Sequence, residues 1–519
     1  MKPLPYLPYG HVMALAPIDV WFRLLSNAGG PIPWRYWPRL IFALVCSLAA
    51  TVLTLPERLL FSLWIRWCGS AFVGKPSNAN PAPLFILGYY RSGTTHLQYL
   101  LDRDPALRSP RWVETLAPQG FMLSWALLRL ILTPFMSLRR PMDGVAFGPE
   151  LPSEDDFALS NWALASTLPC RVAVPQAHAF YDRFNDLAGL TPAEFGRWQR
   201  FQRDFVYKMS LGAGGRRLLL KTPSHTARVK ELLRLFPEAK FIHLSRSSRE
   251  VLRSNLAMAD IARRMYYLQD APPEEQVAAG IVAEYRSTEE KYLEVRASIP
   301  PGQIAEMRFK DLLADPLGEL ARAYAALGLD YTEWFEQNVI EYLDAVQSYR
   351  QGAHRSSDPE QFERWVGELA PLERAFGHER PTLARVAVPA PARKARPGAA
   401  VLAGAFAAFG CAAGWWSLAF LVSNRLSVLI FPAGYVIGII SRRFARRNIP
   451  WLGATAALLT LLLFLGMSLA TTALLDFTSD APVSIAALCH KTAVNLRVEA
   501  RLMWAALGAL SAYKMASRP

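Results

Sequence analysis

A glycine-bounded loop that follows an apolar run is the part of this sequence best suited to bind an anion. Residues 84–87 read Leu-Phe-Ile-Leu, and residues 88–95 read Gly-Tyr-Tyr-Arg-Ser-Gly-Thr-Thr. This order predicts a strand, a loop and the first turn of a helix, where backbone N–H groups hold a phosphate or sulfate group. The residues expected to hold it are Arg91, Ser92, Gly93, Thr94 and Thr95.

The loop differs from the Walker pattern G-x-x-x-x-G-K-[ST] at one position. It keeps Gly88, Gly93 and the hydroxyl of Thr95, but Thr94 stands where the lysine belongs. That lysine reaches the β- and γ-phosphates of a nucleotide, so its loss disfavours an ordinary ATPase. Arg91 supplies positive charge from inside the loop instead, which fits a nucleotide with a shorter anionic tail.

A lysine and an arginine stand at the ends of two further apolar runs. Lys221 closes the predicted strand 217–221, and Arg246 follows the predicted strand 241–245. Open α/β sheets bind ligands at the carboxyl ends of their strands, so both cations are expected at that edge. Ser254 lies eight residues after Arg246, on the helix predicted to follow. An arginine fork beside a helix that supplies further donors suits a phosphate group.

Three motifs in this order resemble the sulfotransferases that use 3′-phosphoadenosine-5′-phosphosulfate (PAPS). They are R-S-G-T-T at 91–95, K-T-P at 221–223, and R-x(7)-S from Arg246 to Ser254. The similarity is to the branch that includes bacterial sulfotransferases and the tyrosylprotein enzymes, and it covers about 83–380. It implies a P-loop-like, three-layer α/β fold with a central parallel sheet.

The resemblance also implies a role for each of these residues. The loop 91–95 would grip the 5′-phosphosulfate, and Arg246 and Ser254 would contact the 3′-phosphate. Lys221 would neutralise charge on the leaving phosphate oxygen, with Arg91 as a second cation at the reacting group. PAPS is then the co-substrate, and no metal is required.

The base that takes the proton of the acceptor is open between two carboxylates. Glu114, in Pro-Arg-Trp-Val-Glu, resembles the glutamate of the tyrosylprotein branch. Glu154, in Pro-Ser-Glu-Asp-Asp, resembles an acidic segment of the bacterial branch. A carboxylate can act as a base when burial and neighbouring cations tune its pKa. His225 also resembles a position of the bacterial branch, whereas His96 is interpreted as a packing residue.

The elements that must position these side chains alternate between residues 83 and 381. Apolar runs predict strands at 84–88, 217–221, 241–245 and 304–309. Helical periodicity between them predicts helices at 224–236 and 248–259. This alternation is typical of an α/β domain with a parallel sheet. Residues 112–210 interrupt the pattern, and we expect them to build the acceptor pocket.

The composition indicates a membrane-associated protein with an anionic partner. Hydrophobic residues make up 52% of the 519 residues, the mean hydropathy is +0.13, and the net charge is +14. Anionic lipid and a polyanionic nucleotide fit this charge better than nucleic acid, because no aromatic-basic RNA motif is present. The five cysteines have no C-x-x-C spacing, which argues against a zinc site or a disulfide framework and favours a reducing compartment.

The first 82 residues are expected to form a membrane-associated helical region. Residues 40–55 are apolar or small, a run shorter than the ~20 residues that span a bilayer. With the apolar residues 59–65 behind it, this run predicts an interfacial or re-entrant helical pair, and a true span is left open. Residues 121–138 form a second apolar amphipath, interpreted either as a buried or lid helix or as membrane contact.

A basic, proline-rich linker at 382–397 leads into an apolar module at 398–519, for which we expect three or four membrane spans. Two of its apolar runs, 398–423 and 451–475, exceed the length that a bilayer requires. The basic segment 441–447 should face the cytoplasm. Counting back through two spans places the catalytic domain on the same side of a bacterial inner membrane.

Together these features predict a multi-pass membrane enzyme that transfers a sulfuryl group from PAPS to a hydroxyl or an amine. A lipid or other amphiphilic acceptor would explain why the enzyme is held at the bilayer. One alternative is a phosphotransferase with a degenerate P-loop, which would need Mg²⁺ and an acidic ligand at a strand end. Another is a non-catalytic, nucleotide-binding membrane protein. The acceptor and the oligomeric state do not follow from the sequence.

Overall fold

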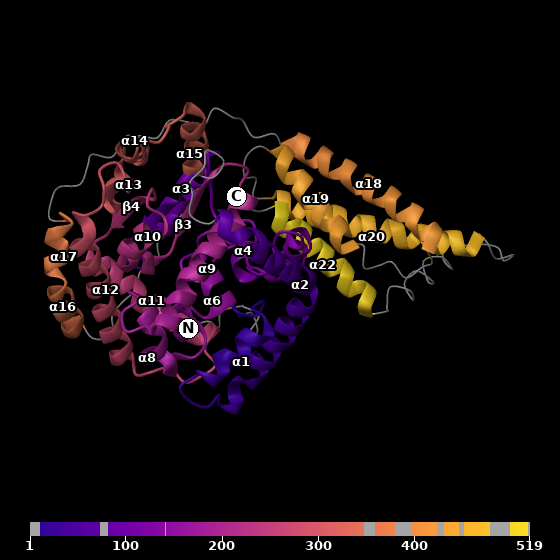
Figure 1. Ribbon diagram of the computed structural model, residues 1–519. Coiled ribbons are helices and arrows are strands. Elements are labelled where there is room, and N and C mark those ends of the chain that lie inside the picture. Colours follow the sequence, from indigo (N-terminus) through magenta and orange to yellow (C-terminus); the bar gives the residue numbers. More distant parts are fainter. Residues whose placement is uncertain are drawn as a thin grey trace.

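A computed structural model shows a parallel sheet inside a rounded body, from which a helical bundle projects (Figure 1). The strands are β1 (Leu84–Leu87), β2 (Leu107–Arg108), β3 (Arg217–Lys221), β4 (Lys240–Ser245) and β5 (Ile304–Arg308). Their order in the sheet is β2-β3-β1-β4-β5, and each neighbouring pair is parallel. The structure describes residues 11–72, 81–140, 142–346, 359–378, 397–422, 430–445, 451–477 and 499–516.

The four predicted strands are present with nearly the predicted bounds, and β2 is an additional short edge strand. All residues of β1 are buried, as expected for a parallel strand that helices cover on both faces. Phe85 and Leu87 belong to one hydrophobic core, whereas Leu84 and Ile86 belong to a second. Because successive side chains of a strand point to opposite faces, these two cores lie on either side of the sheet.

Helices on both faces complete the body (Figure 1). They include α3 (Thr94–Leu101), α4 (Trp112–Leu116), α6 (Asp155–Ala163), η4 (Pro223–Arg228), α10 (Val229–Leu235) and α11 (Ser248–Met265). The others are α7 (Leu168–Val172), α8 (His178–Tyr181), α9 (Pro192–Leu211), α12 (Glu274–Arg296), α13 (Phe309–Ala314), α14 (Pro316–Leu327), α15 (Glu333–Val346), α16 (Pro359–Glu368) and α17 (Ala370–Ala375). The helix predicted at 224–236 is therefore divided into η4 and α10, and the one predicted from 248 is longer than expected.

The N-terminal region contains α1 (Ile18–Ser26) and one long helix, α2 (Trp37–Phe72). The expected pair of short helices is wrong, because both apolar runs belong to this single helix, which continues through Pro56. A proline inside a helix removes one backbone hydrogen bond, and here the contacts of α2 with the body support the helix on both sides of it. Within the described ranges, Trp34–Trp67 is the one segment with the length and composition to cross a membrane.

The C-terminal module is a bundle of α18 (Pro397–Val422), α19 (Ile430–Ala445), α20 (Leu452–Phe477) and α22 (Glu499–Ala516). It meets the body at α5 (Trp125–Phe135), where Lys514 Nζ donates to the backbone oxygen of Met136 at 2.7 Å. From this contact α18 and α20 extend away from the body (Figure 1). That these helices cross a membrane stays a prediction, and the linker 382–397 lies almost wholly outside the described residues.

Candidate active site

The loop between β1 and α3 has a backbone shape that two glycines make possible. Gly88 has a φ of 133°, and a Cβ there would come within 2.5 Å of the backbone oxygen of Leu244. Gly93 has a φ of 95°, and a Cβ there would come within 2.3 Å of the Phe309 ring. Other residues would be strained and would clash at both positions. The two predicted loop glycines therefore allow the chain to turn sharply at the carboxyl end of the sheet.

Arg91 is the centre of the loop and adopts a conformation that side-chain-bearing residues rarely take, with a φ of 70°. Its Nε donates to Ser254 Oγ at 2.9 Å, and its backbone oxygen accepts from the Arg246 guanidinium at 3.0 Å. The structure thus brings together the loop, the end of β4 and the helix α11. Strained backbone of this kind gathers at binding sites.

Arg246 directly follows β4 and is 8% exposed. Its guanidinium lies 4.8 Å from the centre of the Phe309 ring, and its Nε donates to Glu250 at 2.9 Å. Ser254 lies about one helical turn after Glu250 on α11 and is 5% exposed. An arginine fork and a hydroxyl converge next to the loop, as the spacing of the motif predicts.

Lys221 ends β3 and is 1% exposed. Its Nζ donates to Thr95 Oγ1 at 3.3 Å and forms a close ion pair with Glu154. Burial lowers the pKa of Lys221, and the opposite charge of Glu154 opposes that shift. The lysine predicted from one strand, the hydroxyl of the loop and one of the two candidate bases therefore form a single contact group.

A buried network holds the backbone on either side of this group. Asp155, which follows Glu154, accepts from Thr222 Oγ1 at 2.9 Å and is 2.7 Å from His225 Nε2. Burial raises the pKa of Asp155, but the charge and hydrogen bond of His225, with further hydrogen bonds, lower it to about 2. His225 thus touches the neighbour of Glu154, a supporting position that agrees with its place beside the motif.

Two further residues of the site carry no recognisable motif. The Asp143 carboxylate accepts from Arg91 at 2.8 Å and from Arg140 at 2.6 Å through the same oxygen, Oδ2. Burial raises the pKa of Asp143, but the charges of Arg140 and Arg91 outweigh it and lower the pKa. The charge of Arg140 also acts on Lys221 and Glu154. The segment around residue 140 reads as a polar turn, so sequence reasoning had no signal for it.

Glu114 is the one predicted residue that the structure does not bring to this group. Its carboxylate accepts from the backbone N–H of Arg111 at 2.6 Å and pairs with Arg108. In this position it caps the start of α4 from within the helix. His96 packs in its predicted role beside the rings of Phe309 and Tyr342.

Residues 83–333 match the model of the sulfotransferase family. This part of the chain belongs to that family. The chain is 29% identical over 383 residues to the omega-hydroxy-beta-dihydromenaquinone-9 sulfotransferases of Mycobacterium bovis and Mycobacterium tuberculosis, covering 72% of this chain and 92% of each relative. A crystal structure of a sulfotransferase from Mycobacterium avium shares the fold, with a TM-score of 0.51, 19% identity, and coverage of 75% of this chain and all of that one.

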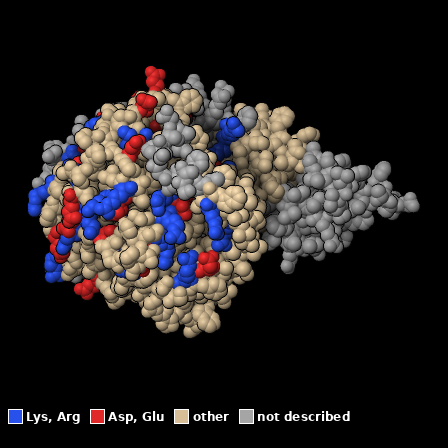
Figure 2. Space-filling view, in the orientation of Figure 1, with Lys and Arg blue, Asp and Glu red and all other residues tan. Residues whose placement is uncertain are grey.

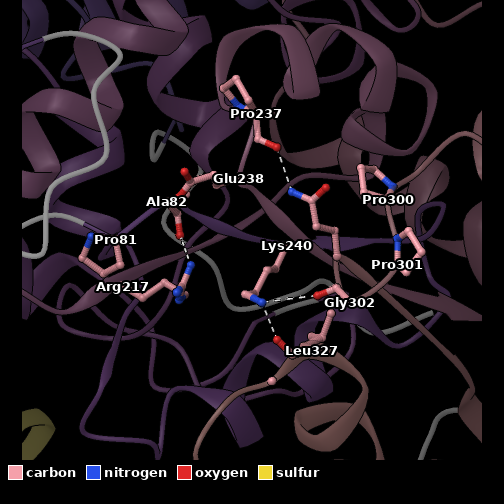
Figure 3. Close-up of a pocket in the computed structure, with 12 residues that line it drawn as sticks. Pro81, Ala82, Arg217, Pro237, Glu238, Lys240, Pro300, Pro301, Gly302 and Leu327 are labelled. Atoms are coloured by element: carbon pink, nitrogen blue, oxygen red, sulfur yellow. Dashed lines mark hydrogen bonds between the residues drawn. The ribbon is translucent and has the colours of Figure 1, made fainter.

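This sulfotransferase also has an open hollow at the opposite, amino-terminal end of the sheet (Figure 3). Arg217 and Lys240, the first residues of β3 and β4, lie beside it. Their side chains donate to backbone oxygens, those of Ala82 for Arg217 and of Gly302 and Leu327 for Lys240. These cations hold loops together, and the hollow is separate from the predicted site. In the described part of the chain, no group of three or more His, Cys, Asp or Glu residues could hold a metal ion.

Proposed function

We propose that this sulfotransferase moves a sulfuryl group from PAPS to a hydroxyl or amine of a lipid or other amphiphilic acceptor. The observation that carries the proposal is that cations from two strand ends meet at the loop: Arg246 contacts the backbone of Arg91 within it, and Lys221 contacts Thr95 at the start of α3. The loop N–H groups, Ser92, Thr94 and Thr95 would hold the 5′-phosphosulfate at the start of α3. Arg246 and Ser254 would bind the 3′-phosphate, which a guanidinium fork matches in geometry.

The transfer step follows from the contacts of Lys221. The acceptor oxygen or nitrogen attacks sulfur, and the bond from sulfur to the bridging phosphate oxygen breaks, with its electron pair moving to that oxygen. The Lys221 ammonium would neutralise the developing charge in a site from which water is excluded. Glu154 would take the proton of the acceptor, since it is the candidate base that touches Lys221.

Asp143 would be displaced when the donor binds. One carboxylate oxygen of Asp143 bridges the guanidinium groups of Arg91 and Arg140. A sulfate or phosphate oxygen is also an anionic acceptor and can take the same position between two guanidinium forks. Arg140 then adds a cation to the reacting group, next to Arg91.

A lipid acceptor is supported by two independent observations. Two relatives that this chain covers for 92% of their length are named for a hydroxylated dihydromenaquinone, a lipid with a polar end. The most apolar 18-residue stretch of the segment Trp34–Trp67 has a mean hydropathy of 2.0, and hydrogen bonds from Arg39 and Trp64 hold this segment beside the catalytic body. We propose that α18 and α20 span the membrane and that Arg442 and Arg443 keep the catalytic body on the cytoplasmic side.

Donor binding tests this assignment through matched arginine variants. Arg246→Ala should weaken the binding of 3′,5′-ADP to the purified protein by about tenfold to a hundredfold, because a charge-assisted contact to phosphate is lost. Arg249→Ala, on the exposed side of α11 and paired with Glu363, is the control and should bind like the parent. Equal affinity in both variants would rule out this phosphate site. Such a result would not distinguish a phosphotransferase from a non-catalytic nucleotide-binding protein. A transfer assay distinguishes these two alternatives.

A further inference from the structure

Helix α2 has one buried face and one exposed, apolar face along most of its length. The buried residues recur every three or four positions along one face: Ala43, Ser47, Ala50, Thr54, Glu57 and Phe61. The opposite face exposes between 45% and 84% of large apolar side chains: Ile41, Val45, Leu48, Val52, Leu55, Leu59, Leu63 and Trp67. We call these residues the apolar stripe. A continuous stripe of this kind marks an interaction surface, whereas single exposed apolar residues do not.

The buried face is fixed to the catalytic body from one end to the other. Near the start of α2, Arg39 donates to the backbone oxygen of Tyr267 at 2.6 Å. Near its end, Trp64 Nε1 donates to the hydroxyl of Tyr207 at 3.0 Å. The helix is therefore attached over a distance of about 38 Å, at 1.5 Å per residue. A helix that crossed the bilayer could keep these contacts only if the body entered the bilayer with it.

The middle of α2 is attached most firmly of all. The carboxylate of Glu57 accepts from the backbone N–H groups of Met122, Leu123 and Ser124 at 2.6, 3.0 and 2.9 Å. It also lies 3.5 Å from Nζ of Lys208, whose side chain is 0% exposed. In a spanning helix this position would lie near the centre of the membrane. Here it is the point at which α2 holds the start of α5.

We propose that α2 lies flat in the membrane interface, with the apolar stripe inserted into one leaflet and the catalytic body attached to its other face. A long helix with one apolar face and one attached face is suited to the boundary between headgroups and acyl chains. Upright, the segment Trp34–Trp67 would be about 51 Å long, against a hydrocarbon core of about 30 Å. The inference concerns placement on the membrane and does not depend on the chemistry of the donor site.

Lipid fits the stripe better than a second copy of this chain. Exposed tryptophans stand near both ends of the helix: Trp34, in the short turn η1 (Trp34–Tyr36) just before it, is 81% exposed, and Trp67 is 84% exposed. Tryptophan favours the headgroup level. Arg66 is exposed beside them and suits anionic headgroups. The stripe continues onto Leu123 and Leu127, which are 72% and 44% exposed. A flat self-association surface would require no tryptophan at its two ends.

The same side of the molecule carries the C-terminal bundle. Helix α2 lies along the edge of the body from which α18 and α20 extend, and it runs across their direction (Figure 1). This edge is largely uncharged, whereas Lys, Arg, Asp and Glu side chains are spread over the rest of the visible face (Figure 2). An in-plane helix at the base of apolar helices that leave the body is the arrangement expected at a bilayer surface.

Depth measurements at three positions of the stripe test the proposal on the full-length protein. A fluorescent amino acid is placed at Val45, Val52 or Leu59, one at a time, and the protein is reconstituted in phosphatidylglycerol and phosphatidylcholine vesicles. Quenching by lipids with a nitroxide on acyl carbon 5 is compared with quenching by lipids labelled at carbon 12. Glu275, an exposed residue of α12, is the matched control away from the stripe.

An in-plane helix predicts the same shallow depth at all three positions. The ratio of carbon-5 to carbon-12 quenching should exceed one and agree within about twofold among Val45, Val52 and Leu59, and the label at Glu275 should not be quenched. Deep quenching at Val52 with shallow quenching at the other two would show a spanning helix. Absence of quenching at all three, with energy transfer between labelled copies, would show that a second copy covers the stripe. Either result overturns the proposal.

Discussion

Lys221 is a charged group that the fold keeps almost completely away from water. Burial, and to a smaller extent the charge of Arg140, lower its pKa, and Glu154 is the carboxylate that opposes this shift most strongly. The ion pair therefore keeps the lysine protonated, and so able to act on the leaving oxygen, until the donor binds. Breaking a buried pair by removing one partner is far more costly than breaking a surface pair.

The pH dependence of transfer should report this balance. As the pH rises through the lowered pKa of Lys221, the ammonium loses its proton and the rate falls, at a pH below the value of 10.5 for an ordinary lysine. Glu154→Gln removes the group that raises the pKa, so the alkaline fall should move to lower pH, in addition to any loss of rate. Rates of sulfuryl transfer between pH 6 and 10 measure both. An alkaline limb that is unchanged in Glu154→Gln would contradict the coupling.

The bridge between Arg91 and Arg140 should compete with the donor. Asp143→Ala removes the carboxylate that pairs with both guanidinium groups. The variant should therefore bind 3′,5′-ADP about tenfold more tightly, because tenfold in affinity corresponds to the free energy of about one charged hydrogen bond. Asp143→Glu keeps the charge and serves as the comparison. Isothermal titration calorimetry measures the affinities. Weaker binding in Asp143→Ala would show that the carboxylate helps to shape the site.

At the scale of elements, the sequence predicted the strands well because their apolar runs are short and bounded. It also placed Lys221 and Arg246 at strand ends, since parallel strands share one edge. Arg140 could not be found this way, because its role depends on a turn that returns to the loop through Asp143. The length of α2 was missed for a different reason: Pro56 and Glu57 signal an interruption, whereas contacts made by the body support the helix there.

Glu57 is the clearest test of how α2 is joined to the body. Glu57→Gln weakens three hydrogen bonds at the start of α5 and leaves buried Lys208 without its charged neighbour. We expect a loss of about 3 kcal/mol in unfolding free energy. Arg58→Ala, the adjacent and more exposed position, should change it by less than about 1 kcal/mol. Detergent-solubilised protein followed by thermal or chemical denaturation provides the comparison, and equal stability of both variants would contradict the role of Glu57.

At the scale of the whole molecule, two apolar parts attach to one catalytic body. The N-terminal helix contacts the body along its length, and the C-terminal bundle meets α5 through α22. A sheet that opens its carboxyl edge to a soluble donor would thus stay close to acceptors held in the bilayer. A lipid or amphiphilic acceptor was predicted from the apolar segments of the sequence. No residue that recognises the structure of the acceptor could be identified from the sequence alone.

A truncated chain that ends at residue 396 distinguishes membrane attachment through α2 from membrane attachment through the C-terminal helices. Without α18 and α20 it should remain on membranes through α2 and be released by alkaline carbonate, whereas the full chain should require detergent. The physical reason is that an interfacial helix has far weaker anchorage than helices that span the core. Fractionation followed by immunoblotting measures the distribution. Release of the full chain by carbonate would contradict spanning by the C-terminal helices.

The most direct test of the central claim follows sulfur from donor to lipid. Membranes that contain this protein are incubated with ³⁵S-labelled PAPS, and the lipid extract is compared with that from membranes carrying Lys221→Ala. We expect a labelled lipid whose rate of formation falls by at least about a hundredfold in the variant, since preorganised charge of this kind lowers the barrier by roughly 3 kcal/mol or more. Binding of 3′,5′-ADP should change much less. Equal labelling by parent and variant, or no labelled species with the parent, would contradict this expectation.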